Sequence, residues 1–269
     1  MQDKTNHDLH HTDIKAVFLD FDGTVYSHVT DGIPRSTIEA VRKLKEKGIL
    51  VFLCSGRALP EMDDFDITEL DPDGMILTNG LMAVGRNNEI IYDMPCEGEL
   101  KERLIAAFRR KKIPMYFCTM DQMFLNFCSD IVVHVQAAVS SRIPPIKEYE
   151  GETFYMASAF IDNEDSYNEM MSLRDIAEIT YWHEGAVDIV PKGISKPLGI
   201  NKILEKYSLP LESTLAIGDG ENDADMLRHC AIGLAMGNSC KEAIEAADYV
   251  TEDIDADGLY LALQHYGII

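Results

Sequence analysis

Positively charged residues are scarce in this sequence. Its 269 residues include 24 Lys and Arg against 46 Asp and Glu, which gives a formal net charge of −22. Phosphate backbones and anionic lipids repel a surface of this sign, so we expect neither a nucleic acid nor a membrane as partner. Solubility is the ordinary consequence of such a charge, and it does not by itself indicate a function.

Paired cysteines and long apolar runs are also missing. No apolar run approaches the roughly 20 residues that span a bilayer, and the polar start, MQDKTNHDLHHTD, is unlike a signal peptide. We therefore expect a cytoplasmic protein. No two cysteines have the C-x-x-C spacing of zinc and redox sites. Several of them lie in apolar runs, where a reduced, buried thiol fits. The six are Cys54, Cys96, Cys118, Cys128, Cys230 and Cys240.

The first part of the chain alternates apolar strands with an amphipathic helix. Residues 1–13 are expected to form a disordered tail. The run IKAVFLD, from Ile14, predicts a buried strand, and residues 36–47 predict a helix because apolar residues recur every three positions. A second strand, ILVFLC, and a third within GMILTNG follow. This rhythm predicts a parallel sheet with helices on its faces.

The middle of the sequence has a different texture. It contains turn signals, short alternating segments such as FYMASAF, and helical stretches near residues 99–112 and 166–177. We interpret this part as an inserted α+β domain. The earlier rhythm then returns with the apolar segments TLAIGDG, AIGLAM and YVT. The predicted division is a core of residues 14–84 and 186–269 and an insertion of residues 85–185.

Residues with catalytic potential collect first in the segment DFDGT, residues 20–24, directly after the first strand. Ligands of open α/β sheets bind beyond the carboxyl ends of the strands. A carboxylate there, such as Asp20, can attack phosphorus, and Asp22 can act as general acid and then base. The alternative is an ordinary acidic turn, since Asp-Gly also occurs elsewhere in the chain.

Two polar residues follow other strands or open a helix. Ser55, with Gly56 beside it, ends the second core strand, where a hydroxyl and backbone amides can hold phosphate oxygens. Its alternative role is to cap a helix. Lys196 opens a helix and offers a positive charge to a phosphate and to a carboxylate. Its alternative role is that of a solvated surface lysine.

A second acidic segment, GDGEND, residues 218–223, follows the strand TLAI. Asp219 is expected to meet Asp20 across the sheet end, with Asp223 farther away. Carboxylates and carbonyl oxygens are the ligands that Mg²⁺ prefers. The alternative is a glycine-rich turn in which Asp223 caps the next helix.

The four segments in this order resemble the haloacid dehalogenase-like superfamily, and within it the Cof-type sugar phosphatases of subfamily IIB. The matching motifs are DFDGT (20–24), SGR (55–57), GISK (193–196) and GDGEND (218–223). The resemblance covers nearly the whole chain after the tail. It implies an α/β fold with a Rossmann-like, doubly wound parallel sheet as core and an inserted α+β cap of the C2B type.

The resemblance also implies a role for each matched residue. Asp20 is the nucleophile and Asp22 the general acid and base, while Ser55, Gly56 and Lys196 hold the transferring phosphoryl group. The expected Mg²⁺ ligands are Asp20, the backbone carbonyl of Asp22 and Asp219. Asn222 and Asp223 are expected to support the metal or the phosphate. Asn79 is expected to contact the substrate.

The implied activity is Mg²⁺-dependent hydrolysis of a small phosphorylated metabolite through an aspartyl-phosphate. Hexose phosphates, other sugar phosphates, pyridoxal phosphate and flavin mononucleotide all suit this branch. A phosphomutase, a phospho-aspartate receiver module and a structural acidic protein are the alternatives. In the cap, His183 and Glu184 are candidate substrate contacts, with surface polar residues as the alternative. Two departures from the family pattern are Pro197 after the lysine and the Ala224-Asp225 pair after GDGEND.

Overall fold

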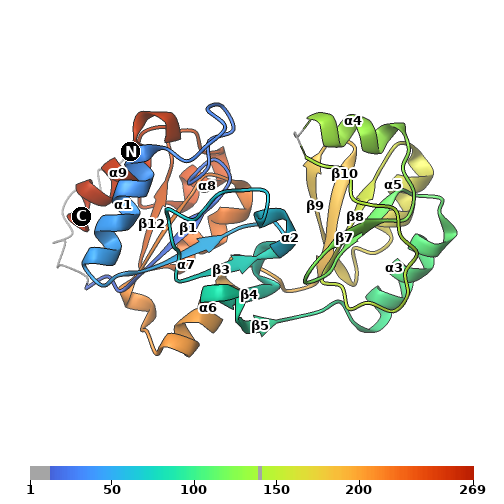
Figure 1. Cartoon of the computed structure of the whole chain (residues 1–269), viewed down its shortest axis with the longest axis horizontal. Helices are drawn as coiled ribbons and strands as arrows, with labels where there is room; N and C mark the ends of the chain where they lie inside the picture. The colour runs from blue at the N-terminus through green and yellow to red at the C-terminus, as the bar shows by residue number, and fades with distance from the viewer. Residues whose placement is uncertain (1–12, 139–140) are drawn as a thin grey trace.

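The computed structural model describes residues 13–138 and 141–269. It consists of a larger core and a smaller cap, connected by two chain segments (Figure 1). The predicted tail of residues 1–13 falls, apart from Asp13, outside the described residues.

Within the described residues, eight strands form the core sheet, in the order β13-β12-β11-β1-β2-β3-β4-β5. All pairings from β13 to β3 are parallel. Their bounds are β1 Ala16–Asp20, β2 Leu50–Cys54, β3 Gly74–Leu77, β4 Met82–Gly85, β5 Ile90–Asp93, β11 Thr214–Gly218, β12 Ile232–Ala235 and β13 Tyr249–Val250. The prediction of a doubly wound α/β core is therefore confirmed.

The last two core strands depart from the predicted parallel arrangement. β4 pairs antiparallel with β3 and with β5. The chain joins β3 to β4 through residues 78–81 alone, and a parallel crossover needs about a dozen residues or more. The core sheet thus ends in an antiparallel hairpin that leads into the cap.

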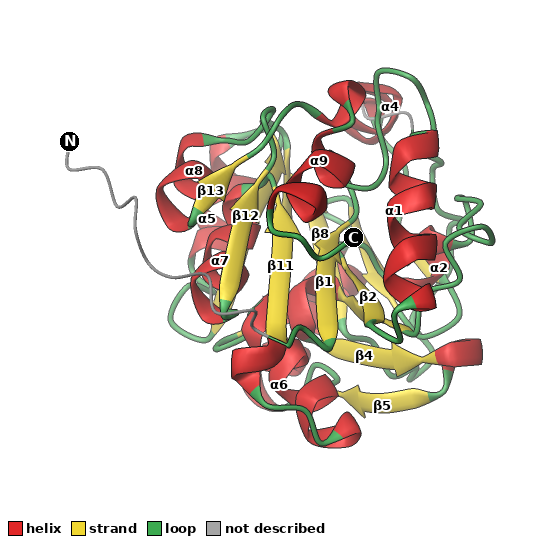
Figure 2. Ribbon diagram, turned by 90° about the vertical axis from the view of Figure 1, so that its left-hand side faces the viewer, coloured by secondary structure: helices red, strands yellow, loops and turns green. Residues whose placement is uncertain are grey.

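Helices cover both faces of the core sheet (Figure 2). α1 (Arg35–Glu46) and α9 (Gly258–His265) pack on one face; α6 (Lys196–Tyr207), α7 (Ala224–His229) and α8 (Lys241–Ala246) pack on the other. In α1 the buried residues Ala40, Val41 and Leu44 follow the helical period and form the stripe that meets the sheet. The short α2 (Leu59–Met62) follows β2.

The cap is a five-stranded sheet in the order β7-β6-β8-β10-β9, with antiparallel neighbours throughout. α3 and α5 lie on the side away from the core (Figure 1). The bounds are β6 Met115–Cys118, β7 Met123–Leu125, β8 Met156–Phe160, β9 Ala177–His183, β10 Ala186–Pro191, α3 Gly98–Arg110, α4 Asp130–Ala138 and α5 Glu164–Met171. An α+β insertion was predicted, although the helix expected over 166–177 ends at Met171 and α4 was not predicted.

The two sheets divide the chain later than the predicted boundaries at residues 85 and 185. β5 belongs to the core sheet and β10 to the cap sheet. The chain therefore crosses between them at residues 94–97 and 192–195. The alternation in AVDIVP indicates a strand but not the sheet to which the strand belongs. The predicted boundary at residue 185 therefore assigned β10 to the core, whereas it belongs to the cap sheet.

Candidate active site

The carboxyl ends of three adjacent strands bring the predicted residues together. β1 ends at Asp20, β2 is followed by Ser55, and β11 is followed by Asp219. β1 lies between β2 and β11 with parallel register. Because parallel strands end at the same edge of a sheet, side chains from residues 20, 55 and 219 meet at one place.

Lys196 is fully buried at this edge. Its Nζ donates to Asp20 Oδ1 at 2.6 Å, to Asp223 Oδ1 at 2.5 Å and to the carbonyl oxygen of Cys54 at 3.0 Å. Burial alone lowers the pKa of Lys196, but the charges of Asp20 and Asp223 raise it well above its ordinary value. Lys196 is therefore an ammonium and not a surface lysine, and Pro197 in the first turn of α6 does not keep it from the site.

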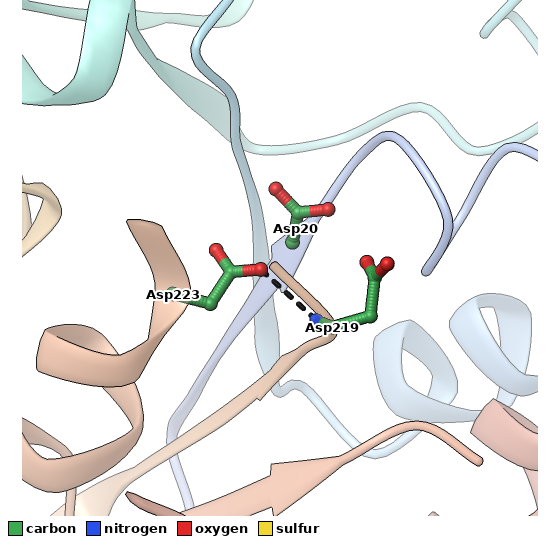
Figure 3. A group of neighbouring side chains, drawn as sticks. All are labelled: Asp20, Asp219 and Asp223. Atoms are coloured by element: carbon green, nitrogen blue, oxygen red, sulfur yellow. Dashed lines mark hydrogen bonds between the residues drawn. The ribbon is translucent and has the colours of Figure 1, made fainter. Parts of the chain in front are cut away.

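Three carboxylates meet at this edge of the sheet, and two of them, Asp20 and Asp223, contact the ammonium. Asp20, Asp219 and Asp223 each offer an oxygen within 4.8 Å of the others (Figure 3). Burial and the nearby charge of Asp223 raise the pKa of Asp20, and burial raises the pKa of Asp219 to about 6. The donor set consists of hard oxygens, and its negative charge exceeds that of one ammonium. These residues fit a divalent cation such as Mg²⁺.

Asp223 supports this cluster from the loop that precedes α7. Its Oδ2 accepts the backbone N–H group of Asp219 at 2.9 Å (Figure 3). It also accepts the backbone N–H group of Gly220 at 2.8 Å. It makes no side-chain capping bond to α7, so the alternative of a simple helix cap does not describe it. Thr24 Oγ1 donates to Asp219 Oδ1 at 2.9 Å. The carboxylate of Asp219 is thus fixed from the loop after β1, and that of Asp223 from its own loop.

The carboxylate of Asp22 points to different partners. Arg57 donates to it from Nε at 2.8 Å and from Nη2 at 2.6 Å, and His28 Nε2 lies 2.8 Å from Oδ1. The Arg57 guanidinium also lies over the ring of Phe65, 4.5 Å from its centroid. Asp22 is therefore held beside the metal-type cluster without joining it through its side chain, so only its backbone carbonyl is left for the predicted metal contact.

Gly23 makes the close approach of the first loop to Asp219 possible. Its φ of +83° is strained for any side chain, and a Cβ there would lie 2.4 Å from Asp219 Oδ2. Asn238 Nδ2 donates to the Gly23 carbonyl at 2.8 Å and lies 3.4 Å from Asp219 Oδ2. A larger residue at position 23 would push the loop after β1 away from the loop that carries Asp219.

The residues predicted to bind phosphate or substrate lie at the same edge. Ser55 is buried, and its Oγ accepts the N–H of Arg57 at 3.1 Å. It does not cap α2, whose cap position is Ala58. Asn222 Nδ2 donates to Asn79 Oδ1 at 2.9 Å. Gly56 is adjacent to Asn79, so a Cβ at Gly56 would lie 3.3 Å from its Nδ2.

A cavity of about 740 Å³ lies between core and cap. Asp20, Asp22 and Asp223 line its core side. The residues lining its cap side are Tyr116, Gln136, Ala138, Ser141, Met156, Thr180, Tyr181, Trp182 and Asp188. His183 and Glu184 are absent from the lining, and His183 Nδ1 instead accepts the N–H of Gly185 in the turn between β9 and β10. For these two residues the surface alternative is the better description, while three residues just before them on β9 face the cavity.

Sequence reasoning gave no role to four residues of this site: Thr24, His28, Arg57 and Asn238. Thr24 and Arg57 stand within the quoted motifs, so their position was available as a signal. Asn238 follows β12, whose carboxyl end lies at the same sheet edge. His28 lies in an irregular loop and carries no pattern that would identify it.

The family model for haloacid dehalogenase-like hydrolases matches residues 17–263. The chain belongs to this family, and it is a phosphatase, a phosphoric monoester hydrolase. It is 32% identical over 262 residues to the protein named "Putative phosphatase YkrA" from Bacillus subtilis (strain 168), covering 96% of this chain and 99% of the relative.

Two solved structures have the same fold over nearly the full chain. BT1666 from Bacteroides thetaiotaomicron, a phosphatase of this superfamily, is 28% identical with a TM-score of 0.87, covering 99% of this chain and 100% of its own. The sugar phosphatase BT4131 of subclass IIB is 32% identical with a TM-score of 0.81, covering 95% and 100%. In the part of this chain that the structure describes, no helix is long and apolar enough to cross a membrane.

Proposed function

We propose that this protein hydrolyses phosphate monoesters of small metabolites, sugar phosphates among them, with Mg²⁺ and through an aspartyl-phosphate on Asp20. The observation that carries the proposal is the cluster of Asp20, Lys196, Asp219 and Asp223, of which Asp20 and Asp223 line the cavity. Sugar phosphates enter the proposal because BT4131, a sugar phosphatase, is 32% identical to this chain.

In the first step an oxygen of Asp20 attacks phosphorus, and the bond from phosphorus to the ester oxygen breaks. For phosphoryl transfer, a protein mainly has to place the attacking and leaving oxygens in line with phosphorus and to neutralise the charge on the phosphoryl oxygens. Lys196, an ammonium between Asp20 and Asp223, supplies positive charge, and the amides and hydroxyl at Ser55 and Gly56 supply hydrogen bonds. Mg²⁺, held by Asp20, Asp219 and the carbonyl of Asp22, adds charge neutralisation when bound.

Asp22 handles the proton in both steps. It gives a proton to the departing ester oxygen and then takes one from the water that attacks the aspartyl-phosphate, which releases inorganic phosphate and restores Asp20. Arg57 and His28 hold the Asp22 carboxylate at the cavity wall, within reach of a bound ester. The cap above the cavity excludes bulk water while Asp20 is phosphorylated.

The test is phosphate release from p-nitrophenyl phosphate over many turnovers with Mg²⁺. We expect EDTA to stop it, and Asp20→Asn to abolish it while the thermal melt stays that of a folded protein. Near-normal kcat in Asp20→Asn would show that another residue is the nucleophile. A single turnover without further release would favour a receiver module, and phosphate moving to a second hydroxyl of a sugar would identify a mutase.

A further inference from the structure

Four polar side chains form a row across the cap sheet. The strand register pairs Tyr116 of β6 with Ser158 of β8, Ser158 with Asp188 of β10, and Asp188 with Thr180 of β9. Directly opposed residues of neighbouring strands point to the same face. Tyr116, Asp188 and Thr180 all line the cavity, so this row lies on the face that the cap turns toward Asp20.

Asp188 is the acidic member of this row. Its neighbours on β10, Val187 and Ile189, point the other way into the apolar cluster under α3 and α5. Ser158 Oγ donates to Asp188 Oδ1. Burial raises the pKa of Asp188 to about 7. The side chain of Asp188 is half-buried, and a carboxyl with one hydroxyl as its well-formed donor has acceptor capacity left over for a ligand.

A donor without a well-formed hydrogen bond lines the same cavity. Trp182 Nε1 is buried and makes no hydrogen bond of standard geometry among the described residues, although it lies close enough to Asp188 to favour the charged form of that carboxyl. From the core side, Glu61 of α2 lines the cavity, and its charge contributes to raising the pKa of Asp188. A ligand group entering here meets carboxyl oxygens that accept and an indole N–H that donates.

Positive charge is missing from the cap wall. Among the described residues on the cap side of the cavity, none is Lys or Arg. On the core side Arg57 lines the cavity, but Asp22 already accepts two of its N–H groups. A second anionic group on the substrate would therefore meet Asp188 and Glu61 without a free cation to offset them.

From this arrangement we infer that Asp188 is a specificity-determining residue for the leaving group of the substrate. It accepts a hydrogen bond from a neutral polyhydroxyl leaving group, with Trp182 Nε1 donating to the same part of the ligand, and it rejects leaving groups that carry a second anion. This inference rests on the proposed phosphatase activity and narrows its substrates to monoesters of neutral polyols.

The physical reason lies in what each ligand group can do. A hydroxyl can donate to Asp188 and accept from Trp182, which satisfies both. At pH 8, above the pKa of Asp188, a substrate carboxylate cannot donate to it and faces two acidic side chains in a partly water-excluded space. Sites built to pair a hydroxyl discriminate strongly against analogues that leave their buried groups unpaired.

The experiment compares two open-chain monoesters, sorbitol 6-phosphate and 6-phosphogluconate, which differ in a terminal hydroxymethyl against a carboxylate. With Mg²⁺ at pH 8, where Asp188 is ionised, we expect kcat/KM of the wild type to favour the polyol by about 100-fold or more, and Asp188→Asn to reduce this ratio to about tenfold or less. Trp182→Phe should lower kcat/KM for the polyol several-fold. The matched control is Asp31→Asn, which removes one charge from the core side of the same cavity and should keep the wild-type ratio.

Each other result decides against the inference. A wild-type ratio near one, an unchanged ratio in Asp188→Asn, or an equal change in Asp31→Asn would overturn it. So would turnover of p-nitrophenyl phosphate without turnover of sorbitol 6-phosphate. The rate of Asp188→Asn on p-nitrophenyl phosphate verifies that this variant is folded. If wild type with Mg²⁺ hydrolyses none of the three esters, the proposed function itself fails, and the inference fails with it.

Discussion

Lys196 and Asp223, 27 positions apart, form a fully buried ion pair in which Nζ lies 2.5 Å from Oδ1 and both side chains are 0% exposed. The same ammonium contacts Asp20. Removing one member of such a group leaves the others charged and without compensation inside the protein, so it serves as a sensitive probe of the site.

Lys196→Met should destabilise the protein by about 3–5 kcal/mol, the usual cost of leaving buried charges unpaired. The measurement is urea unfolding in EDTA, so that only the protein's own charges contribute. Lys196→Met combined with Asp223→Asn should recover part of the lost stability without recovering activity, because one orphaned charge is gone. A loss below about 1 kcal/mol in the single variant would mean that the pair contributes little.

Asp22→Asn should affect esters according to their leaving groups. A nitrophenolate leaves without help, whereas a sugar alkoxide needs a proton, so we expect kcat/KM to fall about 10²–10⁴-fold for alkyl phosphates and much less for p-nitrophenyl phosphate. Steady-state kinetics on both esters measures the difference. Equal losses would show that Asp22 positions the substrate and does not transfer a proton.

Gly23→Ala should weaken the response to Mg²⁺. The backbone at Gly23 is left-handed, and an added Cβ would approach Asp219 Oδ2 to 2.4 Å. We expect the Mg²⁺ concentration at half-maximal rate to rise by about tenfold, which corresponds to about 1.4 kcal/mol. Gly32→Ala is the matched control, since a Cβ there meets nothing within 4 Å. A similar Mg²⁺ response in both variants would contradict the role given to Gly23.

Asp188 should make the stability of the protein fall as pH rises from about 4 to about 7. Burial raises the pKa of this carboxyl to about 7 in the folded protein, against about 3.9 in the unfolded chain. Below pH 4 both states hold the proton; between these values only the folded state holds it, so each step upward in pH disfavours folding. Above about 7 the contribution is constant.

The measurement is the difference in unfolding free energy between wild type and Asp188→Asn across this range, since the amide does not titrate. Wild type should lose stability relative to the variant as pH rises. A difference that stays flat from pH 4 to 8 would mean that Asp188 ionises as freely in the folded state as in the unfolded one.

Much of the core and of the site could be predicted because both depend on local signals. Each of Asp20, Ser55 and Asp219 ends or follows an apolar run, and the order of parallel strands places such residues at one edge. Lys196 shows the limit of this reasoning. A lysine at a helix start reads as solvated until the tertiary fold buries it, so only the ordered set of motifs indicated its position in the site.

The cap was harder to predict for a physical reason. Three of its strands, β6, β7 and β8, are short and buried on both sides, so alternation does not distinguish the face under α3 and α5 from the face toward the core. Asp188 lies beside Ser158 and Thr180 because of the register between strands, and no local sequence pattern contains this register. The same lack of long-range information put β10 in the wrong sheet and left α4 unpredicted.

Asp20 and Lys196 stand 176 positions apart, with the whole cap between them. During synthesis Asp20 therefore leaves the ribosome long before its counter-charge, Lys196, has been added to the chain. The cap is one uninterrupted stretch, whereas β1 has no β11 to pair with until residues 214–218 are made. Since domains generally fold as units as they emerge, we expect the cap to mature first and a nascent chain lacking its last third to be inert.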